Sequence, residues 1–238
     1  MTEDLTAAQF VERMRALQDP VELVKIQRYF KSGAGDYGEG DEFMGVRMGQ
    51  MFQLAKEFIN PPPAEIETLM ESPIHKIRSG AMSVMAKQAG QRKTTAERRK
   101  DLYDLYPRRH DRINNWDLVD LAAGNVIGGF LVDKPRDILY DLARSTNMWE
   151  RRTAIYANGA FQRRGDLDDT YAIAAILLDD PEDLLNKAVG GWLRNAGTSD
   201  RPRLLAFLDE HATWMPRTTL TYAMEHLDKD QRAHYRAL

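Results

Sequence analysis

The sequence predicts an all-α protein, an α-solenoid of about six helix pairs forming a curved superhelix with a basic concave groove. Three observations predict it. Apolar residues recur at helical spacing, as in Val46, Met51, Leu54 and Phe58. Prolines recur where short loops lead into helices. No Asn-Gly or Asp-Gly pair lies between alternating apolar runs, so β-hairpins are not supported.

A weak internal repeat gives the order of the elements. Six segments, most of them opening with a basic residue, carry small and aliphatic side chains at the start of a predicted helix. Their spacing of 31 to 41 residues is typical of helix pairs that bury their apolar faces only against neighbouring pairs. The one long step contains a basic insert over residues 91–100. The segments are Arg47–Gly49, Arg78–Ala81, Val119–Ala122, Arg152–Ile155, Asn186–Val189 and Arg217–Leu220.

These repeats predict a single repeat domain over residues 1–238, with a mobile glycine-rich loop at 32–42. The acidic amino terminus has no signal-peptide pattern, and no apolar run approaches the roughly 20 residues of a membrane span. We therefore expect a cytoplasmic monomer without a membrane partner. The absence of cysteine excludes a disulfide scaffold, a thiolate metal site and a thiol nucleophile. No metal or cofactor is expected, because no histidine pairs at ligand spacing and no phosphate-binding loop is present.

The charge is unevenly distributed. The whole chain has a formal charge of −3, but residues 76–112 contain 11 basic and 4 acidic side chains. A basic block can attract a polyanion even when the total charge is negative. A solvated helical hairpin is the competing interpretation. In the solenoid interpretation, equivalent repeat positions face one way, so Arg47, Arg78, Arg152 and Lys187 are expected to line one surface.

Two segments carry candidate functional residues. Trp116 and Asp120 are four residues apart and share one face of a helix, where an aromatic face beside a carboxylate attracts cations. The alternative is a buried tryptophan with Asp117 as a helix cap. Lys187 and Arg194, seven residues apart, also share a helical face. Between them, Gly190 and Gly191 indicate close approach of a neighbouring helix or a ligand.

The segments Asn115–Asp120 (NWDLVD), Trp149–Ile155 (WERRTAI) and Lys187–Arg194 (KAVGGWLR) together resemble the AlkD-type DNA alkylation repair glycosylases. The resemblance runs from about Arg28 to Met224 and implies HEAT-like helical repeats. It also implies excision of cationic N3- and N7-alkylated purines from double-stranded DNA. The matching residues imply a lesion site at Trp116 and Asp120, approached by Tyr29. Arg152 and Arg194 are then expected at the DNA backbone, with Lys187 and Trp192 as further DNA contacts.

One position departs from the family pattern. The resemblance places a second tryptophan where this chain has Gly191, and Trp192 follows one residue later. A shift of one residue turns a helical side chain by about 100°. Either the helix is locally rearranged, or one wall of the cation site is missing. Two alternatives to a glycosylase therefore stay open: a DNA-binding relative with weak or lost excision, and a helical-repeat scaffold that binds a protein.

Overall fold

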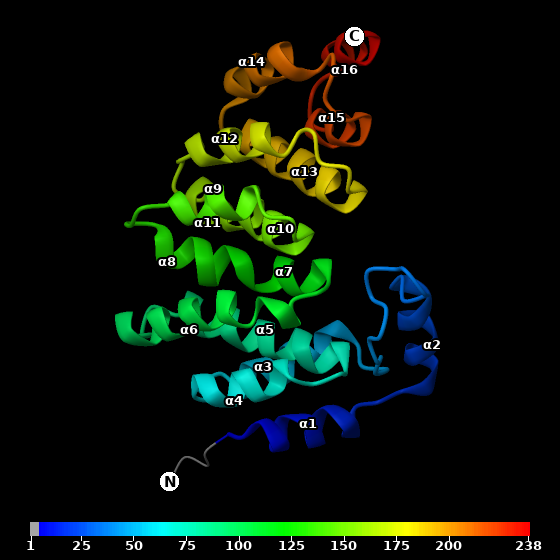
Figure 1. The fold of residues 1–238 in the computed structure, drawn as a ribbon, viewed down its shortest axis with the longest axis vertical. Coiled ribbons are helices and arrows are strands. Elements are labelled where there is room, and N and C mark those ends of the chain that lie inside the picture. Colours follow the sequence, from blue (N-terminus) through cyan, green and yellow to red (C-terminus); the bar gives the residue numbers. More distant parts are fainter. Residues whose placement is uncertain (1–4) are drawn as a thin grey trace. The chain divides into compact units, whose positions relative to one another are not determined.

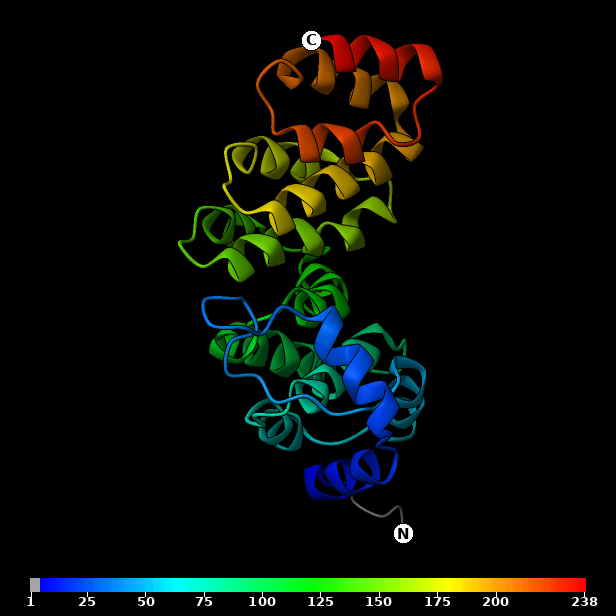
Figure 2. The ribbon, with the colours of Figure 1, turned by 90° about the vertical axis from the view of Figure 1, so that its right-hand side faces the viewer.

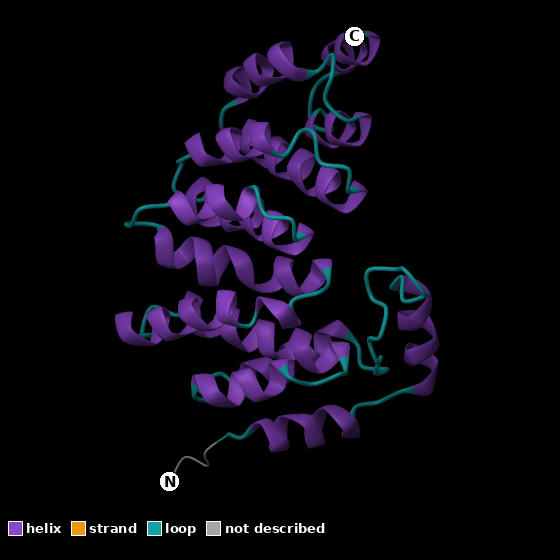
Figure 3. Ribbon diagram, in the orientation of Figure 1, coloured by secondary structure: helices purple, strands orange, loops and turns teal. Residues whose placement is uncertain are grey.

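The computed structural model describes residues 5–238, and within that range it is helical without a β-strand (Figures 1 and 3). The nearest approach to sheet structure is an isolated bridge between Glu42 and Ile74. Contacts between Cα atoms divide the chain into two compact units, residues 1–130 and 131–238. The predicted all-α, α-solenoid fold class is confirmed. The single domain over residues 1–238 and the basic groove stay predictions.

Unit 1 is built around one long buried helix, α5, whose side chains are almost all inaccessible to solvent. Helices α3, α4, α6 and α7 pack around it, and α1 packs against α3 and α4. The helices of this unit are α1 (Ala7–Ala16), α2 (Pro20–Tyr29), α3 (Met48–Glu57), α4 (Pro63–Met70), α5 (His75–Gly90), α6 (Ala96–Arg108), a short 3₁₀ turn (His110–Arg112) and α7 (Trp116–Ala123).

Unit 2 follows a π-helical turn, Gly124–Gly128, that joins α7 to α8 (Gly129–Leu131). In unit 2, α10 packs on α13 and α13 packs on α15, while α9, α12 and α14 lie beside them. Its helices are α9 (Asp137–Ala143), α10 (Met148–Ala157), α11 (Gly159–Gln162), α12 (Asp168–Ile176), α13 (Asp183–Ser199), α14 (Arg201–His211), α15 (Arg217–Ala223) and α16 (Lys229–Ala237).

The predicted repeat coincides with one row of helices in each unit. The six repeat segments lie at the beginning or in the first two turns of α3, α5, α7, α10, α13 and α15. Within unit 1 the row is α3, α5 and α7, and within unit 2 it is α10, α13 and α15, each packed on the next. The sequence repeat was therefore detected in one helix of each pair, and not in the helix that pairs with it.

Local sequence explains where many of these helices begin. Thr6 accepts a hydrogen bond from the Gln9 backbone in a capping box. Asp19 caps α2 just before Pro20, a residue that is well suited to the first helical position. Asp200 and Asp228 cap α14 and α16 in the same way. The basic insert 91–100 forms a turn up to Thr95, which caps α6, and its last five residues are helical.

The glycine-rich loop 32–42 is a loop, as predicted, and consists of successive hydrogen-bonded turns. Gly35 and Gly40 have positive φ angles, which side chains with a Cβ adopt rarely. The Gly38 N–H donates to the Lys31 carbonyl, closing the loop on itself. Asp41, the next-to-last residue of the loop, has its carboxylate buried against Arg78.

The adjacent glycines of α13 have opposite environments, which gives a paired stability prediction. A Cβ on Gly190 would lie 2.5 Å from the Thr219 carbonyl oxygen of α15, whereas a Cβ on Gly191 would meet nothing closer than Arg194 at 4.0 Å. We expect Gly190→Ala to destabilise the protein by about 1–3 kcal/mol through overpacking. Gly191→Ala should stabilise it by up to about 1 kcal/mol through helix propensity. Thermal or urea unfolding measures both, and equal effects would contradict the packing described.

Candidate functional site

Unit 1 contains a cavity of about 600 Å³ between α2, the segment that enters α3, the start of α5, and α7. This volume is within the range of natural ligand sites. Helix α2 forms one wall although none of its own residues is buried, and it crosses the face of unit 1 in Figure 2. The wall from α7 supplies Trp116 and Asp120. The predicted sharing of one face by these two side chains is confirmed.

An aromatic group lines the α2 side of the cavity. Trp116 stacks on Phe30, with ring centroids 5.8 Å apart, and meets Tyr29 edge to face at 6.0 Å. Tyr29 is 68% exposed, while Phe30 is buried and lies against the His75 ring. Trp116 is half-buried, so the interpretation of it as a buried core tryptophan is wrong. The exposed ring surfaces can stack on a flat, electron-poor group.

The start of α7 is held in place by a buried polar contact with α5. The Asp117 carboxylate lies 2.8 Å from Nε2 of His75 and accepts a hydrogen bond from the Ser79 hydroxyl at 3.2 Å. Asp117 is therefore not the cap of α7, because Asn115 occupies the N-cap position and the Asp117 carboxylate bonds to α5 instead. It fixes the first turn of α7, and with it the direction in which Trp116 and Asp120 project. His75 was missed by sequence reasoning, since a single histidine without helical pairing gives no signal.

Asp120 is half-buried and lines the cavity together with Glu22 of α2. Glu22 lies 2.7 Å from Lys25 and 3.4 Å from Arg47. The hydrogen bond from Lys25 keeps the Glu22 pKa below its ordinary value. Glu22 is thus neutralised by two cations. Asp120 enters the cavity from α7, one helical turn after Trp116.

Lys76 of α5 also lines the cavity, and sequence reasoning missed it too. Only 2% of this residue is exposed, and its ammonium donates to the Met48 sulfur at 3.0 Å. Within residues 5–238, no carboxylate forms an ion pair with it at 4.0 Å or less. Burial lowers the Lys76 pKa below its ordinary value, partly opposed by the negative charge of Asp117.

Arg152 in unit 2 is buried, at 5% exposure, so the expectation that it projects into an open groove is wrong. Its guanidinium donates to the Leu184 carbonyl at 2.6 Å and to the Tyr156 hydroxyl at 2.8 Å, and it lies over the Tyr156 ring. These partners are distant in sequence or one turn away, which the motif alone could not reveal. Its role at DNA phosphates stays a prediction.

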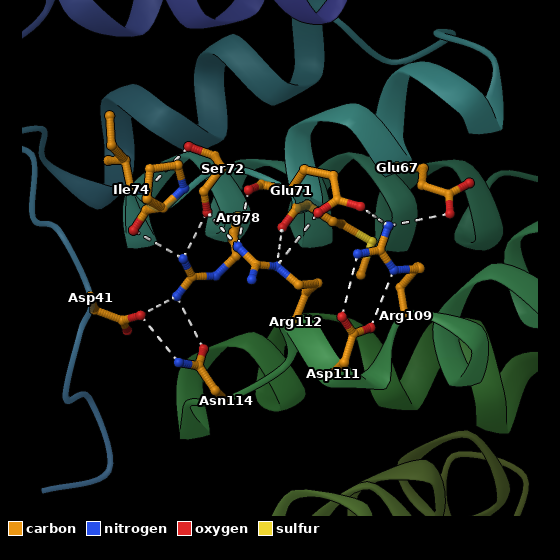
Figure 4. A network of polar contacts seen from close by, with 12 residues as sticks. Asp41, Glu67, Glu71, Ser72, Ile74, Arg78, Arg109, Asp111, Arg112 and Asn114 are labelled. Carbon is orange, nitrogen blue, oxygen red and sulfur yellow. Dashed lines mark hydrogen bonds and ion pairs between the residues drawn. The ribbon is translucent and has the colours of Figure 1, made fainter.

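Arg78 is buried as well, so the four basic repeat positions do not form one exposed row. Other members of the basic block are also engaged within unit 1 (Figure 4). Arg109 pairs with Glu67, Glu71 and Asp111, and the Arg112 guanidinium donates to the carbonyls of Met70, Glu71 and Ser72. Much of the charge of this block is therefore engaged by partners within unit 1 and does not form a solvated face. Arg92 and Lys93 remain exposed in the turn before α6.

Helix α13 is α-helical throughout, so of the two alternatives at Gly191 a local rearrangement of the helix is wrong. Trp192 packs against Gly159, where a Cβ would lie 2.6 Å from the indole ring, and meets Tyr156 edge to face. Gly190 contacts α15, which confirms the close approach of a neighbouring helix. The position of the second family tryptophan is left without a side chain at Gly191.

Lys187 and Arg194 are both half-buried, and each pairs with a carboxylate of unit 2. The Lys187 ammonium lies 2.7 Å from Asp183, one turn earlier on α13, and the hydrogen bond raises the Lys187 pKa. Arg194 pairs with Glu225, which follows α15. Both cations retain partial exposure, so an external anion can compete with these carboxylates.

Comparison with known proteins shows the family of the chain. The model of a family described as DNA alkylation repair enzyme matches residues 10–227, nearly the whole sequence. The chain belongs to the DNA alkylation repair enzyme family. Its fold is similar to that of a solved structure described as a predicted DNA alkylation repair enzyme from Enterococcus faecalis, with a TM-score of 0.67, 16% identity, and coverage of 89% of this chain and 97% of that one. No curated protein sequence matches.

Membership of the DNA alkylation repair enzyme family supports a role in alkylation repair and implies DNA binding. Across residues 5–238, no helix is both long and apolar enough to cross a membrane. In the same range, no three histidine or acidic side chains gather as a metal site would require.

Proposed function

We propose that this chain is a DNA glycosylase that hydrolyses the N-glycosidic bond of cationic N3- and N7-alkylated purines in double-stranded DNA. The observation that carries the proposal is the convergence of Tyr29, Trp116 and Asp120 on one cavity, from helices almost 90 residues apart in sequence. Aromatic faces beside a carboxylate suit a flat cation. The same side chains would bind an uncharged purine less tightly, because it carries no positive charge for the aromatic faces and the carboxylate to attract.

The reaction needs little from the enzyme beyond electrostatics. An alkylated purine already carries a positive charge, so it leaves as a neutral base without a strong general acid. Positive charge then develops on the sugar, in an oxocarbenium-like transition state. A fixed carboxylate beside the sugar stabilises that charge more than it stabilises the ground state. We assign this role to Asp120, which also orients the attacking water, and assign Trp116 to holding the cationic nucleotide.

DNA contacts are proposed for Tyr29, Arg152, Lys187, Trp192 and Arg194. Phosphate contacts position the duplex without reading its sequence. When DNA binds, Lys187 and Arg194 would each exchange an ion pair with a carboxylate of the protein for one with a DNA phosphate. For Arg152, buried hydrogen bonds to Leu184 and Tyr156 mean that substitution disturbs folding as well as binding.

The proposed function is tested by incubating the protein with duplex DNA that contains N7-methylguanine and measuring release of the free base. We expect release well above spontaneous depurination from methylated duplex, and no release of unmodified guanine. Binding without release would instead favour the DNA-binding relative with lost excision. That second candidate is supported by Gly191, where the family tryptophan is absent, and by Trp192, which packs on Gly159. Neither binding nor release would favour the protein-binding scaffold.

Arg194→Ala is expected to weaken DNA binding and to reduce its salt dependence. Loss of one phosphate contact lowers the slope of log K against log salt by about 1, because one fewer counterion is released. Fluorescence anisotropy across a series of salt concentrations measures this slope. Arg201→Ala is the matched control, since Arg201 pairs with Asp228 between α14 and α16 of the same unit. An unchanged slope in Arg194→Ala would remove this residue from the phosphate contacts.

A further inference from the structure

Lys76 lines the proposed active-site cavity, but the proposed hydrolysis does not use its buried amine. Its ammonium contacts the Met48 sulfur, a weak acceptor, and forms no ion pair within 4.0 Å across residues 5–238. Asp117 acts on it through its charge but is itself bonded to His75 and Ser79. An unneutralised buried ammonium is costly, so a lysine in this setting calls for an explanation.

Three properties of the site suit the amine for covalent chemistry. Lys76 lines the same cavity as Asp120, so a nucleophile and a base face one volume. The walls of the cavity are largely apolar and include Val46, Met48 and Leu121. Burial also favours the neutral form of the amine, and the neutral amine is the nucleophile. Lysines in such surroundings form Schiff bases with carbonyl compounds.

We propose that this chain is also an abasic-site lyase, in which the Lys76 amine forms a Schiff base with the aldehyde of an abasic deoxyribose. The proposal rests on the proposed function, because base release generates the abasic sugar in the same cavity. It adds strand cleavage to base excision, and its substrate class is the ring-opened 2′-deoxyribose of an abasic site.

The steps balance without an oxidant or reductant. The Lys76 nitrogen bonds to C1′ of the open-chain sugar, and the carbonyl oxygen leaves as water. Asp120 accepts a proton from C2′, a C2′–C3′ double bond forms, and the C3′–O bond breaks with its electron pair leaving on the 3′ phosphate. Water then hydrolyses the C1′–nitrogen bond, which restores the lysine and leaves an unsaturated aldehyde on the cut strand.

The test uses a duplex with one abasic site prepared in advance, so it does not require the protein to excise a base. Wild-type protein is incubated with this duplex and sodium cyanoborohydride, which reduces a Schiff base to a stable covalent link. We expect a covalent protein–DNA complex, and peptide mass spectrometry is expected to place the link at Lys76. Without the reductant, we expect a strand cut on the 3′ side of the abasic site.

Lys76→Met and Lys76→Arg should both reduce trapping at least tenfold, since neither side chain has an amine that can form this adduct. Lys87→Met is the matched control: it makes the same substitution three turns further along α5, where Lys87 lies over Phe52 outside the cavity. We expect it to trap as wild type does. A duplex whose abasic aldehyde has first been reduced to the alcohol should form no covalent complex with wild type or with any variant.

Folding of the variants is checked by thermal unfolding. Because the folded-state pKa of Lys76 is lowered, the unfolded chain binds its proton more tightly, and this charge opposes folding at pH 7. Lys76→Met is therefore expected to melt no lower than wild type at pH 7. Any excess in the melting temperature of Lys76→Met over wild type should shrink as the pH rises toward the ordinary lysine pKa.

The outcomes separate the two proposals. No covalent complex with wild type, or equal trapping by Lys76→Met, overturns the lyase proposal whether or not methylguanine is released. Trapping at Lys76 without methylguanine release supports the lyase proposal and contradicts the glycosylase. Loss of trapping in Lys76→Met counts as support only when this variant still binds the abasic duplex by anisotropy. If Lys76→Met no longer binds the abasic duplex, the lyase proposal is still supported when Lys76→Arg binds this duplex without forming a covalent complex. A covalent complex with Lys76→Arg overturns the proposal.

Discussion

Asp120→Asn is expected to lower the rate of N7-methylguanine release by about 10²–10³-fold, the effect of removing one preorganised group that stabilises transition-state charge. The amide keeps the size and most of the hydrogen bonding of the carboxylate, but it loses the negative charge that we propose stabilises the sugar cation. Binding of methylated duplex should change far less than the rate. Single-turnover release measured with enzyme in excess separates the chemical step from binding.

Glu22→Gln is the matched control for this prediction, because Glu22 is a carboxylate that lines the same cavity from α2. Lys25 and Arg47 already neutralise it, so its charge contributes little to the field at the sugar. We expect a loss of less than about tenfold from Glu22→Gln. Equal losses from the two variants would mean that the general potential of the cavity drives release, and an unaffected rate in Asp120→Asn would contradict the assigned mechanism.

The spacing of residues along the sequence was enough to predict features that depend only on the geometry of a single helix. The i, i+4 relation of Trp116 and Asp120 places both on the cavity wall. The repeat spacing marks one row of helices in each unit, α3, α5 and α7 in unit 1 and α10, α13 and α15 in unit 2. These inferences hold because helical geometry is set by neighbouring residues. The position of Tyr29 opposite Trp116 depends on tertiary packing of α2, and it was reached only through the family resemblance.

Burial of charged side chains could not be predicted in the same way. Arg78 and Arg152 occupy repeat positions that suggest a common exposed face, yet each is buried by partners distant in sequence, Asp41 for the first and the Leu184 carbonyl for the second. Lys76 lies two residues before Arg78, and nothing in its local sequence distinguishes it from a surface lysine. The environment of a cation is a property of the assembled unit, so only the structure separates these residues.

Arg78→Ala is expected to destabilise the protein by about 3–5 kcal/mol, the cost of removing one partner of a buried ion pair. The Arg78 side chain is 3% exposed and the Asp41 side chain 5%, and their charged groups lie 2.5 Å apart. The same guanidinium donates to the carbonyls of Ser72 and Pro73 and to Asn114 (Figure 4). Alanine would leave Asp41 buried and charged without its cation.

Because of where this network lies, we expect Arg78→Ala to lower both the stability of the protein and the rate of methylguanine release. Arg78 ties the end of the glycine-rich loop, the turn before α5 and the residues before α7 to one side chain, and α7 carries Trp116 and Asp120. Urea unfolding measures the loss, and reduced methylguanine release at temperatures where the variant stays folded would report displacement of α7. Arg108→Ala is the control, because its ion pair with Glu67 is exposed and should contribute about 0–1 kcal/mol.

A double variant distinguishes an unpaired charge from a general loss of packing. If the cost of Arg78→Ala comes mainly from stranding the Asp41 carboxylate, replacing both partners, Arg78→Met with Asp41→Asn, should destabilise less than Arg78→Ala alone. An additive loss would instead assign the energy to the carbonyl contacts of Ser72 and Pro73. A loss below about 1 kcal/mol in Arg78→Ala would mean that water reaches Asp41 once the arginine is gone, and that the pair does not support α7.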